Sequence, residues 1–233
     1  MTRKIPVFAH RGASGYKFEN SMEAFIRAKE LGADGIELDI QQTLDGELYV
    51  IHDANLKRLT GLNRHIQNCK SDELEALTIG KPFWRLLFRK RIPTFQYVVE
   101  WANAYDMPLN IELKESLLLN DEPLKQMLPY LLLPAGSHIS SFHDELLQTV
   151  KEIRPDIETA LIITKKFDFE TLGDYTHIDS IHANKKYYHR RLLQSCVLHN
   201  KGLRFYDIKG DEPFLVSPHP AIIGWITDYP DRL

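Results

Sequence analysis

The chain has 233 residues, of which 43% are hydrophobic and 26% are charged, as in a soluble globular protein. Its 29 basic and 32 acidic residues give a formal net charge of −3, and the lack of a basic excess argues against a nucleic-acid partner. The two cysteines, Cys69 and Cys196, are too few for a disulfide framework and are expected to be reduced thiols. We find no signal peptide and no run near the roughly 18 apolar residues of a membrane span, so we expect a cytoplasmic protein.

The first part of the chain alternates short apolar runs with amphipathic stretches, which is typical of an α/β protein with a parallel sheet. Residues 7–9 are predicted as a strand, and residues 20–31 as a helix with Asn20 as its N-cap. Strands are predicted next at 35–41 and 48–51. The six residues between them are too few for a crossover helix, so these two strands are expected to form a hairpin.

The rest of the chain continues this alternation. Strands are predicted over residues 109–113, 138–141, 159–163, 180–183, 203–206 and 222–227, and helices over residues 95–104, 144–153 and 187–199. With nine predicted strands, one of them an extra hairpin strand, the sequence favours a TIM-type (β/α)8 barrel that forms one domain over residues 1–233. An open doubly wound sheet would show a similar alternation.

The stretch 53–91 breaks the alternation and is too long for a simple connection. Its end, residues 81–91, mixes five cations with apolar and aromatic groups. We expect a short helix there that packs its apolar side on the body, so that no membrane contact is needed. The alternative is a lid, or a surface that meets phosphate-bearing or lipid-like substrates.

Carboxylates concentrate on one face of two predicted strands. Glu37 and Asp39 alternate with isoleucine and leucine in one strand, and Glu112 does so in another. If the apolar faces pack under helices, three carboxylates converge on the interior, where they repel one another unless a cation or a proton lies between them. Such an oxygen-rich site suits Mg²⁺ or Ca²⁺. Lys114, on the face of Glu112, would hold an anion rather than the metal. Solvent-facing positions on an edge strand are the alternative.

Histidines supply groups for proton transfer. His10 and His52 each directly follow a predicted strand, where barrels place catalytic residues. In the predicted hairpin, His52 would lie roughly opposite Glu37. Two histidines can divide the roles of acid and base, although the sequence does not say which takes which, and either one alone could be structural. Arg11 offers a forked guanidinium for phosphate oxygens.

These residues belong to a series of short motifs that follow one another along the chain. They are His10-Arg11-Gly12, Glu19-Asn20, residues 32–39, Asp45-Gly46, His52-Asp53, Leu56, Arg58, Thr60, Gly61, residues 92–95 and 111–114, and more weakly Ser141-Phe142 and residues 226–230. In these motifs the chain resembles the glycerophosphodiester phosphodiesterases of cytoplasmic bacterial type. The resemblance covers nearly the whole chain and is dense before residue 115.

This resemblance implies a distorted TIM-type barrel with residues 53–91 as an insertion beside the active site. It also implies a phosphoric diester hydrolase that uses one divalent cation, Mg²⁺ or Ca²⁺, and small-molecule substrates. Glycerophosphodiesters such as glycerophosphocholine and glycerophosphoethanolamine would be hydrolysed to glycerol 3-phosphate and an alcohol. By position, the implied roles are metal ligands at Glu37, Asp39 and Glu112, an acid/base pair at His10 and His52, and phosphate contacts from Arg11 and Lys114.

The chain departs from the family pattern at several places. Phe18 and Ser21 replace the usual proline and threonine, and residues 203–208 replace a strand with a Trp-Thr-Val-Asn-like sequence. Residues 209–222 are rich in proline where a regular helix is expected. We therefore expect a changed substrate-contacting wall from the last strands. Two other functions stay open: a lysophospholipase D-like or other phospholipid phosphodiesterase, and a non-catalytic ligand-binding barrel.

Overall fold

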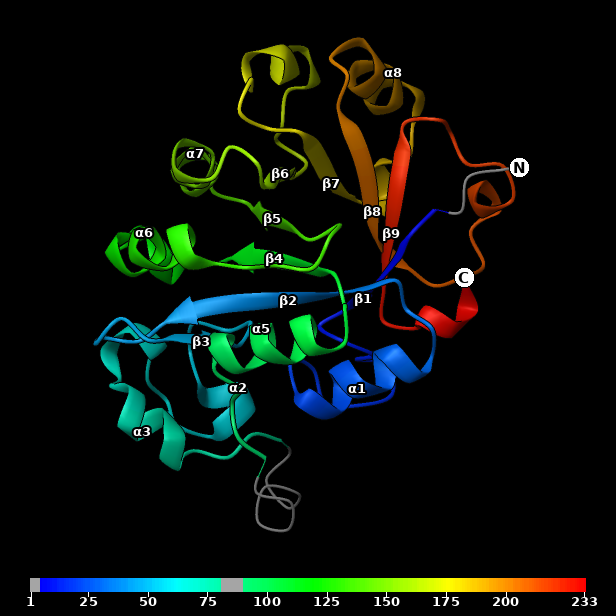
Figure 1. Ribbon diagram of the computed structural model, residues 1–233. Helices are drawn as coiled ribbons and strands as arrows, with labels where there is room; N and C mark the ends of the chain where they lie inside the picture. Colours follow the sequence, from blue (N-terminus) through cyan, green and yellow to red (C-terminus); the bar gives the residue numbers. More distant parts are fainter. Residues whose placement is uncertain (1–4, 81–89) are drawn as a thin grey trace.

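The predicted parallel strands close into a barrel in the computed structural model, which describes residues 5–80 and 90–233 (Figure 1). In the order of the chain, the barrel strands are β1 (Val7–His10), β2 (Gly35–Gln42), β4 (Leu109–Leu113), β5 (His138–Ser141), β6 (Glu158–Ile162), β7 (Ser180–Asn184), β8 (Gly202–Ile208) and β9 (Ile222–Thr227). Each pairs in parallel with the next, and β1 pairs with both β2 and β9. The sheet is therefore closed, which confirms the predicted TIM-type barrel and excludes an open sheet.

One further strand, β3 (Leu48–Val50), pairs antiparallel with β2. This pairing confirms the predicted hairpin. Val50 lies opposite Ile40, so continuing the register places His52 opposite Leu38, one residue from the position expected for it. The backbone N–H of Ile51 still donates to the carbonyl of Asp39 at 2.9 Å, which carries the pairing to the edge of the site.

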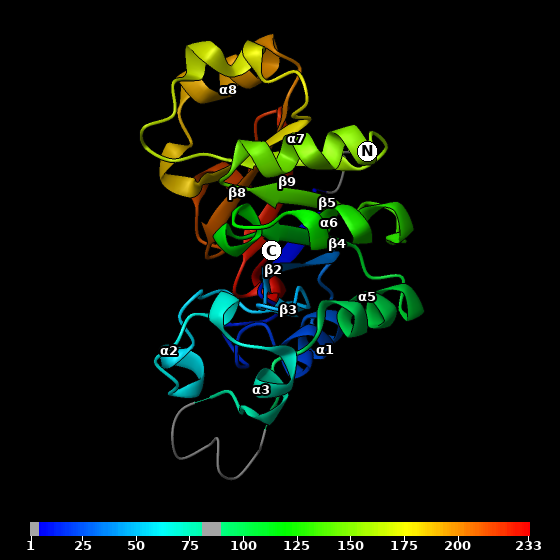
Figure 2. The same ribbon diagram turned by 90° about the vertical axis from the view of Figure 1, so that its left-hand side faces the viewer.

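Helices pack around most of the barrel, as Figures 1 and 2 show. In the described part of the chain, these are α1 (Met22–Glu30), α5 (Phe95–Ala104), α6 (Glu122–Met127), α7 (Asp144–Ile153) and α8 (Arg190–Leu198), and two shorter helices, α2 (Lys57–Thr60) and α3 (Ser71–Ala76), belong to the insertion. Short 3-10 turns lie at Ile66–Asn68, Glu115–Leu118, Leu128–Tyr130, Phe169–Asp174, Lys185–Tyr187, Pro213–Leu215 and Pro230–Arg232. The apolar face of β2, formed by Ile36, Leu38 and Ile40, is fully buried in the main hydrophobic core. Its other face is thereby left to the barrel interior.

The N-cap of helix α1 is Ser21, one residue after the predicted Asn20. The Ser21 hydroxyl accepts a hydrogen bond from the backbone N–H of Ala24 at 3.3 Å. Asn20 has a left-handed backbone with φ of 51°, and its side-chain amide donates to Asp39 at 2.8 Å. The amide is thus engaged by a carboxylate on β2 and does not cap the helix.

This difference can be tested by substitution. Ser21→Ala is expected to lower the free energy of unfolding by about 1 kcal/mol, because the first turn of α1 loses its side-chain acceptor. Urea denaturation of the two proteins measures the change. An unchanged midpoint would contradict the assignment of Ser21 as the cap.

The insertion that follows β3 carries α2 and α3 and lies on the side of the barrel that also carries α1 and α5 (Figures 1 and 2). It packs around its own small hydrophobic cluster, separate from the main core, made of Tyr49, Ile51, Leu56, Leu59, Ile66, Cys69, Leu74, Ile79 and Ile92. Residues 81–89 lie outside the described residues, so the predicted helix or lipid-facing surface at 81–91 stays a prediction.

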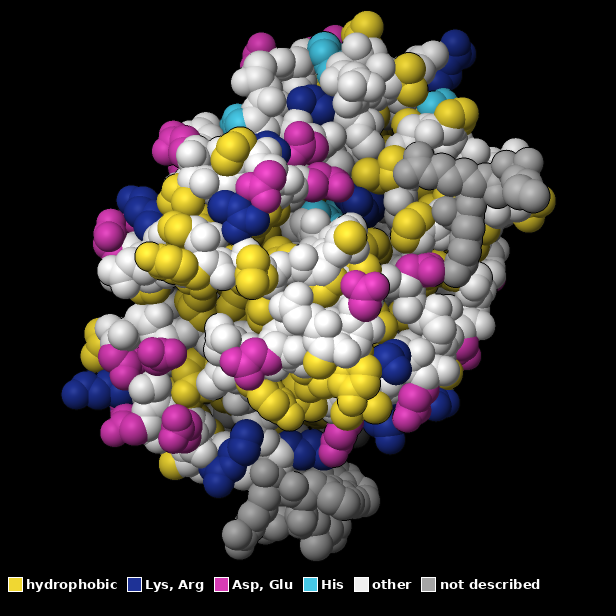
Figure 3. All heavy atoms as spheres, in the orientation of Figure 1, with side chains coloured by type: hydrophobic (Ala, Val, Ile, Leu, Met, Phe, Trp, Pro, Cys, Tyr) yellow, Lys and Arg dark blue, Asp and Glu magenta, His cyan; other side chains and the backbone are white. Residues whose placement is uncertain are grey.

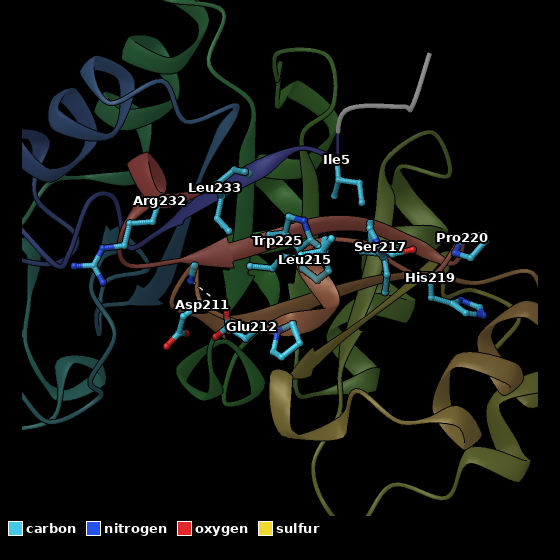
Figure 4. A pocket seen from close by; sticks show the side chains of 16 residues that line it. Ile5, Asp211, Glu212, Leu215, Ser217, His219, Pro220, Trp225, Arg232 and Leu233 are labelled. Atoms are coloured by element: carbon cyan, nitrogen blue, oxygen red, sulfur yellow. Dashed lines mark hydrogen bonds between the residues drawn. The ribbon is translucent and has the colours of Figure 1, made fainter.

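The proline-rich connection from β8 to β9 contains only the 3-10 turn Pro213–Leu215 over residues 209–221, in place of a regular helix. A groove of about 900 Å³ lies there, outside the barrel (Figure 4). Trp225 of β9 and Leu215 lie at its centre. The altered segment 210–220 therefore shapes the outer face of the barrel. The sequence predicts that residues 203–222 change the wall that contacts the substrate. Of these residues, Tyr206 lines the inner cavity described below.

Charged side chains of both signs are interspersed over the face in Figure 3, as the near balance of acidic and basic residues predicts. Within residues 5–80 and 90–233, no helix is both long and apolar enough to cross a membrane.

Candidate active site

Three buried carboxylates meet inside the barrel. Glu37 and Asp39 project from β2, and Glu112 projects from β4, where the parallel register places it beside Asp39. One oxygen from each residue lies within 4.8 Å of the others. Their exposed fractions are only 3%, 0% and 8%. The alternation predicted for both strands thus brings the three acidic residues to one point, and it excludes the solvent-facing alternative.

The environment of this cluster favours an added positive charge. Burial and the neighbouring Asp39 raise the pKa of Glu112 to about 8, and the same two causes raise the pKa of Glu37. Burial also opposes ionisation of Asp39, but Lys114 and Arg11 outweigh it and hold the pKa of that carboxyl well below its usual range. Like charges in a buried site are stabilised by a cation or a proton.

The donor set fits a hard divalent cation. The atoms that converge are carboxylate oxygens, which Mg²⁺ and Ca²⁺ prefer. Asp39 Oδ1 is buried and has no hydrogen bond, although Lys114 Nζ lies 2.8 Å from it in an ion pair of poor hydrogen-bond geometry. A buried acceptor without a hydrogen bond is costly, so this oxygen is available to a metal ion.

His10 lies at the end of β1, beside this cluster. Its Nδ1 is 2.7 Å from Asp228 Oδ1, and its Nε2 is 4.0 Å from Glu37. Asp228 also accepts hydrogen bonds from Ser14 at 3.0 Å and from Lys209 at 3.1 Å. Burial disfavours the charged imidazole, but Glu37 and the hydrogen bond with Asp228 outweigh it and raise the pKa of His10. The ring is therefore oriented with Nε2 toward the carboxylates.

His52 follows β3 and approaches the cavity from the hairpin. Its Nδ1 is 2.7 Å from Asp53 Oδ1, and its backbone carbonyl accepts from the Gln41 side chain at 3.0 Å. Burial lowers the pKa of His52 although the negative charge of Asp39 opposes this shift. The two histidines, each held at Nδ1 by an aspartate, are thus shifted in opposite directions.

Asp53 makes a pH-dependent contribution to stability. Hydrogen bonds from Arg58, and then from His52, lower the pKa of its carboxyl to about 2, against about 3.9 in an unfolded chain. A carboxyl whose pKa falls on folding stabilises the fold above the unfolded value, and this stabilisation is lost as the pH falls through the folded value.

We therefore expect Asp53→Asn to lower the free energy of unfolding by about 1 kcal/mol at pH 7, after allowance for solvent screening, and by much less at pH 2. Urea denaturation at the two pH values measures the difference. An equal loss at both would contradict the sign of this shift.

Arg11 and Lys114 both contact the acidic cluster. Arg11 has a left-handed backbone with φ of 54°, and its backbone N–H donates to Glu37 at 2.7 Å. Its guanidinium donates to Glu19 at 2.9 Å, with Nε 3.4 Å from Asp39. The Lys114 ammonium pairs with Asp39 and donates to Glu112. The sequence predicts that Lys114 holds an anion, and here its ammonium neutralises the carboxylates themselves.

Gly12 allows this sharp turn after β1. Its φ is 79°, and a Cβ at this position would lie 2.7 Å from Ala24 of α1. A larger residue would separate the turn from α1, so Gly12 allows the chain to place His10 and Arg11 side by side at the cavity.

A cavity of about 130 Å³ joins these groups. Of the residues predicted for the site, His10, Arg11, Glu37, His52, Glu112 and Lys114 line it, and Asp39 adjoins it through the carboxylate cluster. Its other lining residues are of two kinds. Phe142, Tyr206 and Ile226 lie in motifs or altered segments found in the sequence, whereas Asn110, Ile162 and His182 are not among the predicted site residues. Phe142, Ile162 and Ile226 add apolar side chains to a lining that is otherwise mostly polar or charged. Nothing in the local pattern of β6 or β7 marks Ile162 or His182 as part of a site.

Other contributors were missed although a signal existed. Asp228 lies in the weak motif at 226–230, yet its contact with His10 spans 218 positions of the chain. Glu19 and Asn20 belong to one motif, in which Asn20 alone is predicted to cap a helix. In the structure they bind Arg11 and Asp39 directly.

The fold and this arrangement together define an α/β-barrel enzyme with a candidate cation site at the ends of its strands. The family model described as the glycerophosphoryl diester phosphodiesterase family matches residues 10–206. The chain belongs to this family of phosphoric diester hydrolases, as its motifs predict.

Individual relatives agree with this assignment. The glycerophosphodiester phosphodiesterase of Caldanaerobacter subterraneus subsp. tengcongensis is 38% identical over 162 residues, which are 68% of this chain and 67% of that protein. Lysophospholipase D of Rattus norvegicus is 39% identical over 113 residues, 46% of this chain and 35% of that protein. The structure of an Oleispira antarctica phosphodiesterase in complex with the product sn-glycerol-3-phosphate has a TM-score of 0.80 at 22% identity, covering 97% of this chain and 94% of that one.

Proposed function

We propose that this enzyme hydrolyses glycerophosphodiesters, such as glycerophosphocholine and glycerophosphoethanolamine, to glycerol 3-phosphate and an alcohol in a metal-dependent reaction. The observation that carries the proposal is the cluster of Glu37, Asp39 and Glu112 with His10 and His52 on one small cavity. A phosphodiester carries one negative charge, and its cleavage needs charge neutralisation and proton transfer on two sides.

Glu37, Asp39 and Glu112 would hold one divalent cation, Mg²⁺ or Ca²⁺. When bound, the ion would supply Lewis-acid activation of the phosphoryl group. Two observations support this role. Burial and the neighbouring Asp39 raise the pKa of Glu112, and Asp39 Oδ1 is a buried oxygen that accepts no hydrogen bond.

His10 and His52 would form the acid/base pair. One takes a proton from the nucleophile, which is water or a substrate hydroxyl, and the other gives a proton to the leaving alkoxide oxygen; with a hydroxyl nucleophile, water opens the resulting cyclic phosphate in a second step. Asp228 and Asp53 support these roles, since each binds an Nδ1 and leaves the opposite ring nitrogen of its histidine for the reaction. Arg11 and Lys114 would contact the phosphate, for which Lys114 would exchange part of its pairing with the carboxylates.

The size of the cavity favours a compact substrate. About 130 Å³ accommodates a phosphate with a small polar group, and the product in the Oleispira antarctica structure is sn-glycerol-3-phosphate. Phe142, Ile162 and Ile226 add apolar side chains to the lining, which favours one alternative, a lysophospholipid substrate, the class named for the related rat lysophospholipase D.

A substrate panel separates these functions. The purified chain, treated with chelator and supplied with Mg²⁺ or Ca²⁺, is assayed on glycerophosphocholine, glycerophosphoethanolamine and lysophosphatidylcholine, with glycerol 3-phosphate and choline measured as products. We expect faster turnover of the two glycerophosphodiesters and release of glycerol 3-phosphate. Faster turnover of lysophosphatidylcholine would favour the alternative, and tight binding without turnover would favour a non-catalytic barrel.

We also propose that residues 1–233 act as one domain in the cytoplasm. Cys69 and Cys196 are both buried and free, which supports a reducing compartment.

A further inference from the structure

We infer that Arg58, in the insertion, is a positioning residue that holds Arg11 and His52 in one geometry across the cavity. This inference rests on the proposed function, because it assigns Arg58 an effect on the reaction of those two residues. Arg58 lies in the short helix α2, outside the barrel strands.

The Arg58 guanidinium binds two carboxylates at once. Its Nη1 and Nη2 donate to the two oxygens of Glu19, each at 2.8 Å. Its Nε and Nη2 donate to the two oxygens of Asp53 at 2.5 and 2.9 Å. Both contacts are bidentate, the geometry in which a guanidinium fixes the orientation of a carboxylate as well as its distance.

Each of these carboxylates also binds one residue of the site. Glu19 Oε1 accepts from Arg11 at 2.9 Å, and Asp53 Oδ1 lies 2.7 Å from His52 Nδ1. A continuous path of hydrogen bonds therefore runs from Arg11 through Glu19, Arg58 and Asp53 to His52. We call this path the arginine clamp.

The clamp joins parts of the molecule that pack separately. Glu19 precedes α1 on the barrel, whereas Arg58 belongs to the insertion with its own hydrophobic cluster. The Glu19 and Asp53 side chains are only 19% and 23% exposed, whereas the Arg58 side chain is 50% exposed, so water is excluded mainly from the carboxylate side of these bonds. Through Arg58 the insertion is coupled to Arg11 as well as to His52. An error of 1 Å in the position of such a group can cost about 100-fold in rate.

The test compares kcat and KM for glycerophosphocholine in wild type and variants. Arg58→Ala is expected to lower kcat by about 10- to 100-fold with KM changed less than about threefold. Arg58→Lys keeps the charge but cannot form two bidentate contacts, so its kcat is expected to stay at least about fivefold below wild type. Full activity in Arg58→Lys would overturn the proposal, because charge alone would then suffice.

Arg64 provides a matched control in the same insertion. Its guanidinium also binds a carboxylate, that of Glu73 at 2.5 Å, together with Cys69 Sγ at 2.9 Å, but it has no contact with a residue of the site. Arg64→Ala is expected to leave kcat within about twofold of wild type. If it lowers kcat as much as Arg58→Ala does, the effect is a general loosening of the insertion, and the proposal fails.

A double-mutant cycle tests whether Arg58 acts through the Glu19 and Asp53 carboxylates, and Arg58→Lys keeps the proposal falsifiable if Arg58→Ala does not fold. Glu19→Gln/Asp53→Asn retains the side-chain shapes but removes the negative charge from both bidentate contacts of Arg58. It is expected to lose as much kcat as Arg58→Ala does. Adding Arg58→Ala to that background should change kcat less than about twofold, since its partners are already weakened. If the triple variant has a higher KM than the Glu19→Gln/Asp53→Asn variant, Arg58 binds substrate directly and the proposal is wrong. Turnover by wild type establishes the proposed function separately from these comparisons.

Discussion

Replacing His10 or His52 with alanine is expected to lower kcat for glycerophosphocholine by about 10²- to 10⁴-fold, because each variant loses a proton-transfer group. KM should change little, since phosphate and metal contacts remain. Steady-state kinetics at saturating metal measures both values. His177→Ala is a matched control: this histidine also lies 2.7 Å from an aspartate, Asp144, but it does not line the cavity.

The same variants can assign the acid and the base. A substrate with a p-nitrophenyl leaving group needs little help from an acid, because the phenolate departs without a proton. The variant that lacks the acid should therefore lose much less activity on this substrate than on glycerophosphocholine. If both variants keep near wild-type kcat on glycerophosphocholine, histidine catalysis is wrong.

Removal of divalent cations is expected to have the second large effect. Chelation should lower turnover by about 10³-fold or more, because the loss of several kcal/mol of charge stabilisation corresponds to that factor. Mg²⁺ or Ca²⁺ at 100 times its dissociation constant should stabilise the fold by about 2.7 kcal/mol, or raise Tm by about 5–10 °C. Activity and thermal unfolding after chelation and re-addition measure both effects.

Substitution of one ligand should separate these two effects. Glu112→Gln is expected to abolish the metal-dependent rise in Tm, yet to leave the metal-free protein at least as stable as wild type. The reason is that burial and the neighbouring Asp39 raise the pKa of Glu112 to about 8, so the carboxyl must take up a proton when the metal-free chain folds at neutral pH, and this proton uptake costs stability. Glu158→Gln is the control, since Glu158 pairs with Arg204 and takes no part in the cluster. A full Tm response in Glu112→Gln would contradict its role as a ligand.

Much of the fold could be predicted because it depends on local patterns. Alternation in β2 and β4 sorts Glu37, Asp39 and Glu112 from their apolar neighbours, and a six-residue connection permits little but a hairpin. The start of α1 was mispredicted for the opposite reason. Asn20 and Ser21 are both good N-caps in isolation, and the choice between them depends on Asp39, a residue of another strand.

The partners of the site residues were beyond prediction from local pattern. Asp228 approaches His10 only when β9 closes the barrel against β1. The bidentate contact of Arg58 with Glu19 likewise forms only when the insertion has folded beside the loop before α1. Such contacts depend on which distant segments lie side by side in the fold, and the periodicity of a short segment does not predict this.

The sequence by itself determined the class of fold, the family and the residues with the right chemistry, because strand alternation and ordered motifs are properties of the chain. Only the tertiary structure decided how those residues are partnered: Lys114 on the carboxylates, the aspartates behind His10 and His52, and Arg58 between Glu19 and Asp53. The physical reason is that buried charges must find counter-charges and hydrogen bonds within the folded volume. Closure of the barrel and packing of the insertion determine which groups lie near enough to supply them.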